Sequence, residues 1–291
     1  MGADFHFRTK VPEARLDDYI ENQDKLINWL KNYEKDHLIL TAGDLVDQPR
    51  ERSDALGFAN YLIKSLPKIY GVLGNHDLLF HSLEAVNIDK TTMGNLINCG
   101  KFVPITEMEV ENVKIFGYHY GQEIQHVRKK THQDKVQIAV YHGMVMEESN
   151  PFFDGHIALD LLKEFPEYDI ILTGDNHQGF IVEYESRVLI NPGSLKRDTA
   201  AQIEHVPCVY SFDTNTLKLE RIKVPTDNDI ISREHLEIEK ERDQRIEQLS
   251  SKFKEVEGAT LEFDKNVYDF LNVNKVRDSV DGYIMKWLSI E

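Results

Sequence analysis

Cysteine is scarce in this sequence, and long apolar runs are missing. The 291 residues include two cysteines, Cys99 and Cys208, which lie far apart and outside any C-x-x-C pattern. Neither a disulfide framework nor a zinc-thiolate site is therefore expected. No apolar run reaches the length of a membrane span, and the N-terminus lacks the pattern of a signal peptide. We therefore expect a cytoplasmic chain that makes no contact with a membrane.

Positive charge is also in short supply. Lys and Arg number 34 against 50 Asp and Glu, which gives a formal net charge of −16. Non-specific binding to nucleic acid draws its affinity from Lys and Arg that neutralise phosphates, so this balance opposes it. A polyanionic substrate would need bound metal, a local basic strip or a partner chain.

Short β-rich apolar runs alternate with polar, helix-compatible stretches between Leu38 and Val188, which is typical of an α/β domain. We expect strands at 37–41, 68–73, 113–118, 137–141, 169–173 and 187–190, and a hairpin of 208–212 and 217–222 that closes a second sheet. The composition changes near Val224, and apolar residues at helical spacing then predict amphipathic helices within 231–256 and 267–288. The expected domains are residues 1–224 and 225–291.

Metal-capable side chains follow five of the strand-like runs. The five motifs are Asp4-Phe5-His6, Gly43-Asp44-Leu45-Val46-Asp47, Gly74-Asn75-His76-Asp77, His142-Gly143 and Gly174-Asp175-Asn176-His177. Each motif alone is weak, because Gly-Asp after a strand is common turn chemistry and a lone His is more often structural. In an open α/β sheet, however, the loops at the carboxyl ends of the strands gather in one place. Five such loops predict one site.

In this order and placement the motifs resemble those of the calcineurin-like metallophosphoesterase superfamily, over residues 4 to about 197. The strand and Asn-Pro-Gly-Ser turn at 188–195, with a C-terminal helical appendage, look most similar to SbcD-type DNA exonuclease subunits of bacteria and their phages. The resemblance implies a four-layer α/β/β/α sandwich over residues 1–224. It makes residues 225–291 a small helical cap that contacts a partner.

The resemblance also implies site residues. Those that would bind two divalent cations are Asp4, His6, Asp44, Asn75, His142, Asp175 and His177. Asp4, His6 and His177 would hold the first cation, and Asp44 would bridge both. A water shared by two cations becomes a nucleophile for in-line attack on phosphorus. His76 would protonate the leaving oxygen, and Asp47 would orient its ring.

Two features depart from the family pattern. Asp175 stands where the family has an imidazole of the second cation, and a carboxylate shifts preference toward Mn²⁺ or Mg²⁺ and away from Zn²⁺. Mn²⁺ is therefore expected first, with Mg²⁺, Fe²⁺ or Zn²⁺ as alternatives. The added negative charge would favour singly charged phosphodiesters over dianionic monoesters. Alternatively, Asp175 only hydrogen-bonds and the second cation binds weakly or not at all. The other departure is the short lead of Met1 to Ala3 before Asp4, which leaves the sheet's first strand almost missing.

Several functional alternatives stay open on the sequence. Asn191, Ser194 and Arg197 could hold a substrate phosphate, or the segment could be a plain β-turn. The first expectation is a Mn²⁺-dependent DNA nuclease of a bacterium or a phage-infected cell, with an SMC-like ATPase and a second copy of the chain as partners. The alternatives are a phosphodiesterase or phosphatase for small nucleotides or phosphoproteins, and a metal-poor scaffold without catalysis.

Overall fold

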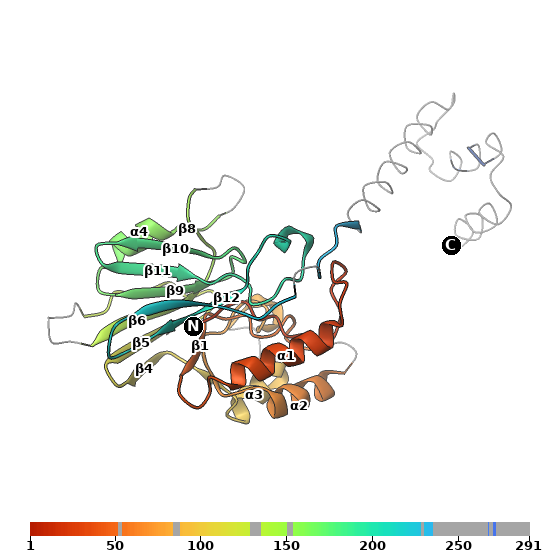
Figure 1. Cartoon of the computed structure of the whole chain (residues 1–291), viewed down its shortest axis with the longest axis horizontal. Helices are drawn as coiled ribbons and strands as arrows, with labels where there is room; N and C mark the ends of the chain where they lie inside the picture. The colour runs from red at the N-terminus through yellow and green to blue at the C-terminus, as the bar shows by residue number, and fades with distance from the viewer. Residues whose placement is uncertain are drawn as a thin grey trace. The chain divides into compact units, whose positions relative to one another are not determined.

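The computed structural model describes residues 1–51, 54–83, 88–128, 135–149, 154–227 and 230–234, together with residues 267, 270 and 271. The chain divides into two compact units, Met1–Ser232 and Arg233–Glu291. Figure 1 shows the strands and helices of the first unit. Within the described ranges, no helix is long and apolar enough to cross a membrane. The two predicted C-terminal helices lie almost wholly outside the described residues and stay predictions, as does the cap assigned to 225–291.

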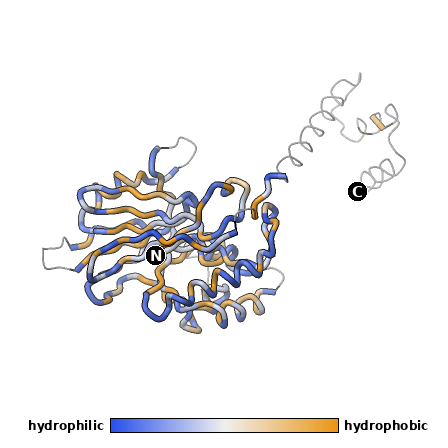
Figure 2. The backbone as a smooth tube through the Cα atoms, in the orientation of Figure 1, coloured by the Kyte–Doolittle hydropathy of each residue, from blue (hydrophilic) through white to orange (hydrophobic). Residues whose placement is uncertain are grey.

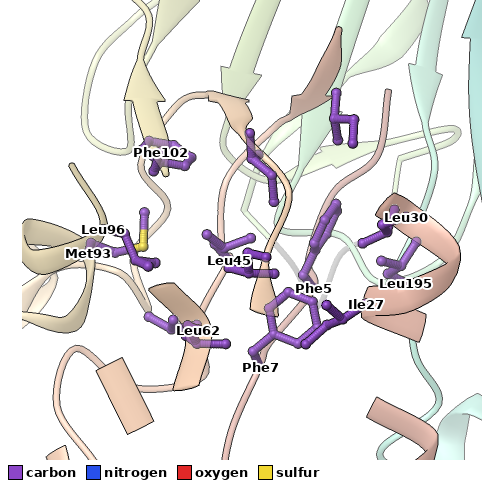
Figure 3. Packing of buried hydrophobic residues seen from close by; sticks show 14 of the residues in the cluster. Phe5, Phe7, Ile27, Leu30, Leu45, Leu62, Met93, Leu96, Phe102 and Leu195 are labelled. Carbon is purple, nitrogen blue, oxygen red and sulfur yellow. The ribbon is translucent and has the colours of Figure 1, made fainter. Parts of the chain in front are cut away.

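A parallel three-stranded sheet supports one half of the site. Its strands, in spatial order, are β1 (Ile39–Thr41), β2 (Ile69–Gly71) and β3 (Phe102–Pro104). Three helices cover its outer face: α1 (Tyr19–Lys31), α2 (Ala55–Ser65) and α3 (Thr92–Asn98). Each helix begins after an N-cap side chain, Asp18, Asp54 or Thr91, that accepts a backbone N–H of the first turn. Phe5 and Phe7 pack with the apolar faces of these helices in one buried cluster (Figure 3).

A six-stranded sheet supports the other half, in the order β10-β11-β9-β6-β5-β4. The strands are β4 (Glu107–Val110), β5 (Val113–Tyr118), β6 (Val136–His142), β9 (Ile170–Gly174), β10 (Phe180–Tyr184) and β11 (Arg187–Asn191). The four inner strands run parallel, and the two edge strands are antiparallel to their neighbours. An inner strand of this kind is buried on both faces, which explains its nearly continuous apolar sequence (Figure 2).

The alternation along β6 separates two cores. Ile138 and Val140 face the first sheet, whereas Ala139 and Tyr141 pack toward α4 (Ala158–Glu164) on the outer side. The layers are therefore helices, sheet, sheet and helix, which confirms the expected mixed α/β sandwich. The remaining short elements are β7 (Val145–Met146), β8 (His156–Ile157), η1 (Leu79–His81), η2 (Ile88–Lys90) and η3 (Ala200–Gln202).

The N-terminal segment lies between the two sheets. Gly2 pairs with the end of β1, and Ala3 forms a bridge with Ser194 after β11. Met1 exchanges backbone hydrogen bonds with Tyr210. Tyr210 belongs to β12 (Cys208–Phe212), which pairs with β13 (Leu219–Lys223) in the predicted hairpin. As expected, the segment before Asp4 forms isolated bridges and no regular strand, but Ala3 to Phe7 is buried on all sides.

Candidate metal centre

The carboxyl ends of the parallel strands bring the five motifs together. Asp44 follows β1, Asn75 and His76 follow β2, His142 ends β6, and Asp175 follows β9. Parallel strands of one sheet end at the same edge, and the bridges made by Ala3 and Phe7 place the Asp4 segment between the two edges. The side chains form three overlapping groups whose ligand atoms lie within 4.8 Å of one another: Asp4, His6 and His177; His6, Asp44 and His76; Asp4, Asp44 and His142.

The first group has the form of a cation site. The Nε2 atoms of His6 and His177 are 3.1 Å apart, which directs two imidazole nitrogens at one point. Asp4 is fully buried, and its Oδ1 accepts the backbone N–H of Asp175 at 3.0 Å. Its other oxygen, Oδ2, is buried without a hydrogen-bond partner. A buried carboxylate oxygen of this kind is costly unless a cation or a donor meets it.

Asp44 belongs to both of the other groups, the one with His6 and the one with His142. Its Oδ1 accepts the backbone N–H of His76 at 2.9 Å, and its Oδ2 is buried without a partner. That Oδ2 lies 3.7 Å from Nε2 of His6 and 3.6 Å from Nε2 of His142. One oxygen therefore faces an imidazole of each group, which is the geometry of a carboxylate shared by two cations.

The ring of His142 is oriented by the backbone. Its Nδ1 lies 2.6 Å from the carbonyl oxygen of Ala42, a contact that requires an N–H at Nδ1. The Nε2 atom then carries the lone pair, and it faces Oδ1 of Asn75 at 2.9 Å. The tautomer set by Ala42 is the one that a metal ligand needs.

The shifted pKa values of the buried side chains also fit a site for divalent cations. Burial, with the charges of Asp44 and Asp175, raises the pKa of Asp4 to about 8, although His142 acts in the opposite direction. Burial also raises the pKa of Asp44 far above its ordinary value. The pKa of His6 falls well below normal because of burial and the neighbouring His177. Carboxylates that resist ionisation beside imidazoles that resist protonation are matched by bound divalent cations. The residues present therefore fit two cations.

The dyad of His76 and Asp47 is built differently from the prediction. Nδ1 of His76 lies 2.7 Å from the backbone carbonyl of Asp47, so the main chain of Asp47 orients the ring. The Asp47 carboxylate instead pairs with Arg8 at 2.8 Å. Arg8 also reaches Asp198 at 3.2 Å. The predicted role of the Asp47 side chain in orienting His76 is therefore corrected to a role of its carbonyl.

Asp175 contacts the site through its backbone. Its φ of 84° lies in the left-handed region, and its N–H donates to Asp4. Among the described residues, none of the three ligand groups includes the Asp175 carboxylate. Its charge nevertheless acts on Asp4, Asp44 and His177, so it lies close to the site. The structure thus places Asp175 beside the cation ligands, and its role as a ligand stays a prediction.

The Asn-Pro-Gly-Ser turn supports the site from behind. Oδ1 of Asn191 accepts the N–H of Gly193, and Ser194 donates its hydroxyl to the Asp4 carbonyl and its N–H to the His177 carbonyl. The Arg197 guanidinium donates to the carbonyls of Ile203 and Asp227. These contacts describe a turn that holds two ligand segments, and they engage the donors of Ser194, whereas Nδ2 of Asn191 is buried without a hydrogen-bond partner.

Two further residues that hold the ligand segments, Asp77 and Lys196, were not predicted from the sequence. The Asp77 carboxylate accepts the N–H groups of Val46 and Gly74, which ties two motif loops together. Lys196 is buried, donates to the carbonyl of His6 and contacts the Tyr19 hydroxyl. Asp77 stands in a quoted motif and could have been found there. A buried lysine after a turn carries no sequence signal, because lysine is almost always exposed.

Backbone strain is concentrated at the ligands. Asp4, His6 and Asp44 have φ values of 51°, 46° and 51°, in the left-handed region that residues other than glycine seldom adopt. Gly74 is required for a related reason, because a Cβ there would lie 2.1 Å from Oδ1 of Asp44. Such conformations persist at functional sites, where the surrounding contacts impose them.

Comparison with known proteins identifies a family whose members carry a metal site of this kind. The calcineurin-like phosphoesterase family model matches residues 3–179. No curated protein matches the sequence.

Similar solved structures include an archaeal phosphodiesterase (15% identity, TM-score 0.41, 76% of this chain and 96% of that chain). A putative 5'-nucleotidase of Staphylococcus aureus is also similar, with 15% identity and a TM-score of 0.44 over 83% of this chain and 57% of that chain. The calcineurin-like phosphoesterase YfkN of Bacillus subtilis has 14% identity and a TM-score of 0.38 over 66% of this chain and 79% of that chain. At these scores, none of the similarities identifies a substrate for this chain. With more than half of its length matched by the family model, the chain belongs to the calcineurin-like phosphoesterases, a family of dinuclear metal-dependent phosphoester hydrolases.

Proposed function

We propose that this chain hydrolyses phosphodiester bonds with two divalent cations, and that DNA is its substrate. The observation that carries the proposal is the unpaired, buried Oδ2 of Asp44 between Nε2 of His6 and Nε2 of His142. When bound, the cations supply Lewis acidity at the phosphoryl group and activation of the attacking water. Mn²⁺ is the proposed metal, because carboxylate donors accompany the imidazoles.

The ligand residues divide between the two cations according to their positions. Asp4, His6 and His177 would hold the first, Asn75 and His142 the second, and Asp44 both. His76 lies beside His6, with ring centroids 4.8 Å apart, yet its Nδ1 is engaged by the Asp47 carbonyl. Its Nε2 would then donate a proton to the leaving oxygen while Nδ1–H keeps the ring in place.

The choice of a diester rests on charge. Asp4, Asp44 and the nearby Asp175 bring three carboxylates to the site, which reduces the net positive field that two divalent cations exert on a phosphate. A singly charged diester depends less on that field than a dianionic monoester does. The choice of DNA rests on the resemblance of the motifs and the 191–194 turn to SbcD-type nuclease subunits.

The acidic character of the chain bears on its partners. With a net charge of −16, it would not hold long duplex DNA alone. We propose that residues 225–291 contact an SMC-like ATPase or a second copy of the chain in the cytoplasm, and that the assembly supplies the basic surface.

One assay separates the candidate functions. The protein with Mn²⁺ is given single-stranded DNA, duplex DNA, a chromogenic diester and a chromogenic monoester. We expect cleavage of the diester and of DNA, loss of most turnover in His76→Ala, and unchanged Mn²⁺ binding in that variant. Strong preference for the monoester would support a phosphatase, cleavage of the small diester without DNA would support a small-nucleotide phosphodiesterase, and inactivity on all four would support a scaffold.

A further inference from the structure

A strained turn follows the Asn75-His76-Asp77 motif directly. The segment η1 contains Phe80 at φ 56° and ψ 23°, and the next residue, His81, has a φ of 50°. Two consecutive residues other than glycine in the left-handed region are unfavourable, and both carry bulky rings. The turn persists only if its surroundings impose it, and such outliers point to function.

The turn is fastened to the candidate metal centre. Nδ1 of His81 lies 2.9 Å from the backbone carbonyl of Asn75, a proposed cation ligand. The ring of His81 also lies edge-on to the ring of His76, with centroids 6.1 Å apart. Leu78 is buried, and the Asp77 carboxylate holds two backbone N–H groups. The position of Phe80, one residue before His81, is thus fixed relative to the proposed proton donor.

Phe80 points into solvent. Its exposed fraction is 82%, the highest among the large exposed hydrophobic residues of the described part, and it is the only aromatic among them. Within the described part of the chain, the Phe80 ring is not buried, so hydrophobic burial there does not offset the strain of its backbone. A ligand that covers the ring would supply that burial.

We propose that Phe80 is a stacking platform for the nucleobase next to the scissile phosphodiester. This inference rests on the proposed function and narrows its substrate class to nucleotides and single-stranded ends of nucleic acid. Every base has a π-face, so stacking on an aromatic ring binds bases regardless of sequence. The platform would hold the base while the cations hold the phosphate, and it would also supply affinity that the acidic chain lacks in basic side chains.

The test removes the ring and keeps the turn. Asn tolerates the left-handed region, so Phe80→Asn preserves the backbone, whereas Phe80→Trp preserves the aromatic face. Leu56→Ala is the matched control, because Leu56 is another exposed apolar residue, at the start of α2 and 71% exposed. The substrates are the p-nitrophenyl ester of thymidine 5'-monophosphate and methyl p-nitrophenyl phosphate, which share a leaving group and differ in the nucleoside.

We expect Phe80→Asn to raise KM for the thymidine ester by about fivefold to a hundredfold. KM and kcat for the methyl ester should not change, and Phe80→Trp and Leu56→Ala should behave as the wild type. Equal effects on both esters, or none on either, would overturn the platform while leaving phosphodiester hydrolysis in place. The latter result would leave the exposed ring to a protein partner.

A second readout does not need turnover. A short single-stranded oligonucleotide carrying 2-aminopurine is titrated with Mn²⁺-loaded His76→Ala protein, which should keep the metal without cleaving the strand, and its fluorescence reports stacking of that base. Quenching by His76→Ala alone and with Phe80→Trp, but not with Phe80→Asn, would support the platform. If no ester is hydrolysed, the proposed function fails, and this titration still decides the role of Phe80.

Discussion

Replacing Asp4 by Asn should stabilise the metal-free protein and destabilise it relative to the wild type once Mn²⁺ is added. Asp4 is fully buried, and its pKa is raised to about 8. A carboxyl group whose pKa is raised in the folded state takes up a proton on folding. The free energy of unfolding therefore falls as the pH rises from the ordinary pKa of an aspartate toward 8. At pH 7 the metal-free protein therefore loses ~4 kcal/mol at this residue.

Asn removes this loss and keeps most of the geometry. Asn adopts a φ of 51° readily, and its Oδ1 can still accept the N–H of Asp175. The new Nδ2 would be buried without an acceptor at the position of the unpaired Oδ2, which costs about 1–3 kcal/mol. The net expectation is a gain of ~1–3 kcal/mol in the free energy of unfolding without metal.

Mn²⁺ should reverse the order. At a thousand times its Kd, Mn²⁺ stabilises the wild type by about 4.1 kcal/mol, which exceeds the ~1–3 kcal/mol lead of Asp4→Asn, whereas the variant lacks one ligand and gains little. Urea denaturation at pH 7, with EDTA and with Mn²⁺, measures both free energies, and Asp36→Asn on the exposed surface is the control. If Asp4→Asn is the less stable protein without metal and gains as much from Mn²⁺ as the wild type, the reasoning is wrong.

Three further predictions concern single residues. Asp47→Asn should retain most of the turnover that His76→Ala loses, because the Asp47 carbonyl orients His76, and equal losses in steady-state kinetics would restore the carboxylate as the orienting group. Gly74→Ala should lose Mn²⁺ affinity at least tenfold in equilibrium dialysis, because its Cβ would collide with Asp44, and unchanged affinity would show that Asp44 is not a ligand. The pKa of His119 is lowered by burial, and its Nδ1 accepts the Leu73 N–H, so stability should fall as pH drops below about 6.5. Urea denaturation at pH 7.5 and 5.5 should show a smaller loss of stability in His119→Asn than in the wild type. An identical pH dependence in both proteins would contradict this role of His119.

The sequence predicted the strands that carry the site because they are buried on both faces. The runs at 113–118, 137–141 and 169–173 appear as β5, β6 and β9, with ends shifted by at most one residue. Strands β3, β4 and β10 were not predicted, nor were the two-residue strands β7 and β8. The first three lie at the edges of their sheets and are partly exposed. Their pairing is imposed by the neighbouring strand, and local composition gives no sign of it.

The proposed metal ligands could be predicted from the sequence, whereas the groups that orient them could not. Motif order and spacing brought Asp44 and His142 to one place, as the structure does. The orientation of each ring depends on backbone carbonyls of Ala42 and Asp47, and any residue type can supply such a carbonyl. The buried Lys196 is likewise defined by tertiary contacts that no local pattern encodes.

The central claim is that two cations act together at this site. Its most direct test is a titration of metal-free protein with Mn²⁺ in which bound metal and hydrolysis of a chromogenic diester are measured on the same samples. The account predicts that turnover appears as the second cation binds and reaches its plateau at two Mn²⁺ per chain. Full turnover with one Mn²⁺ per chain, or no turnover with two bound, would contradict it.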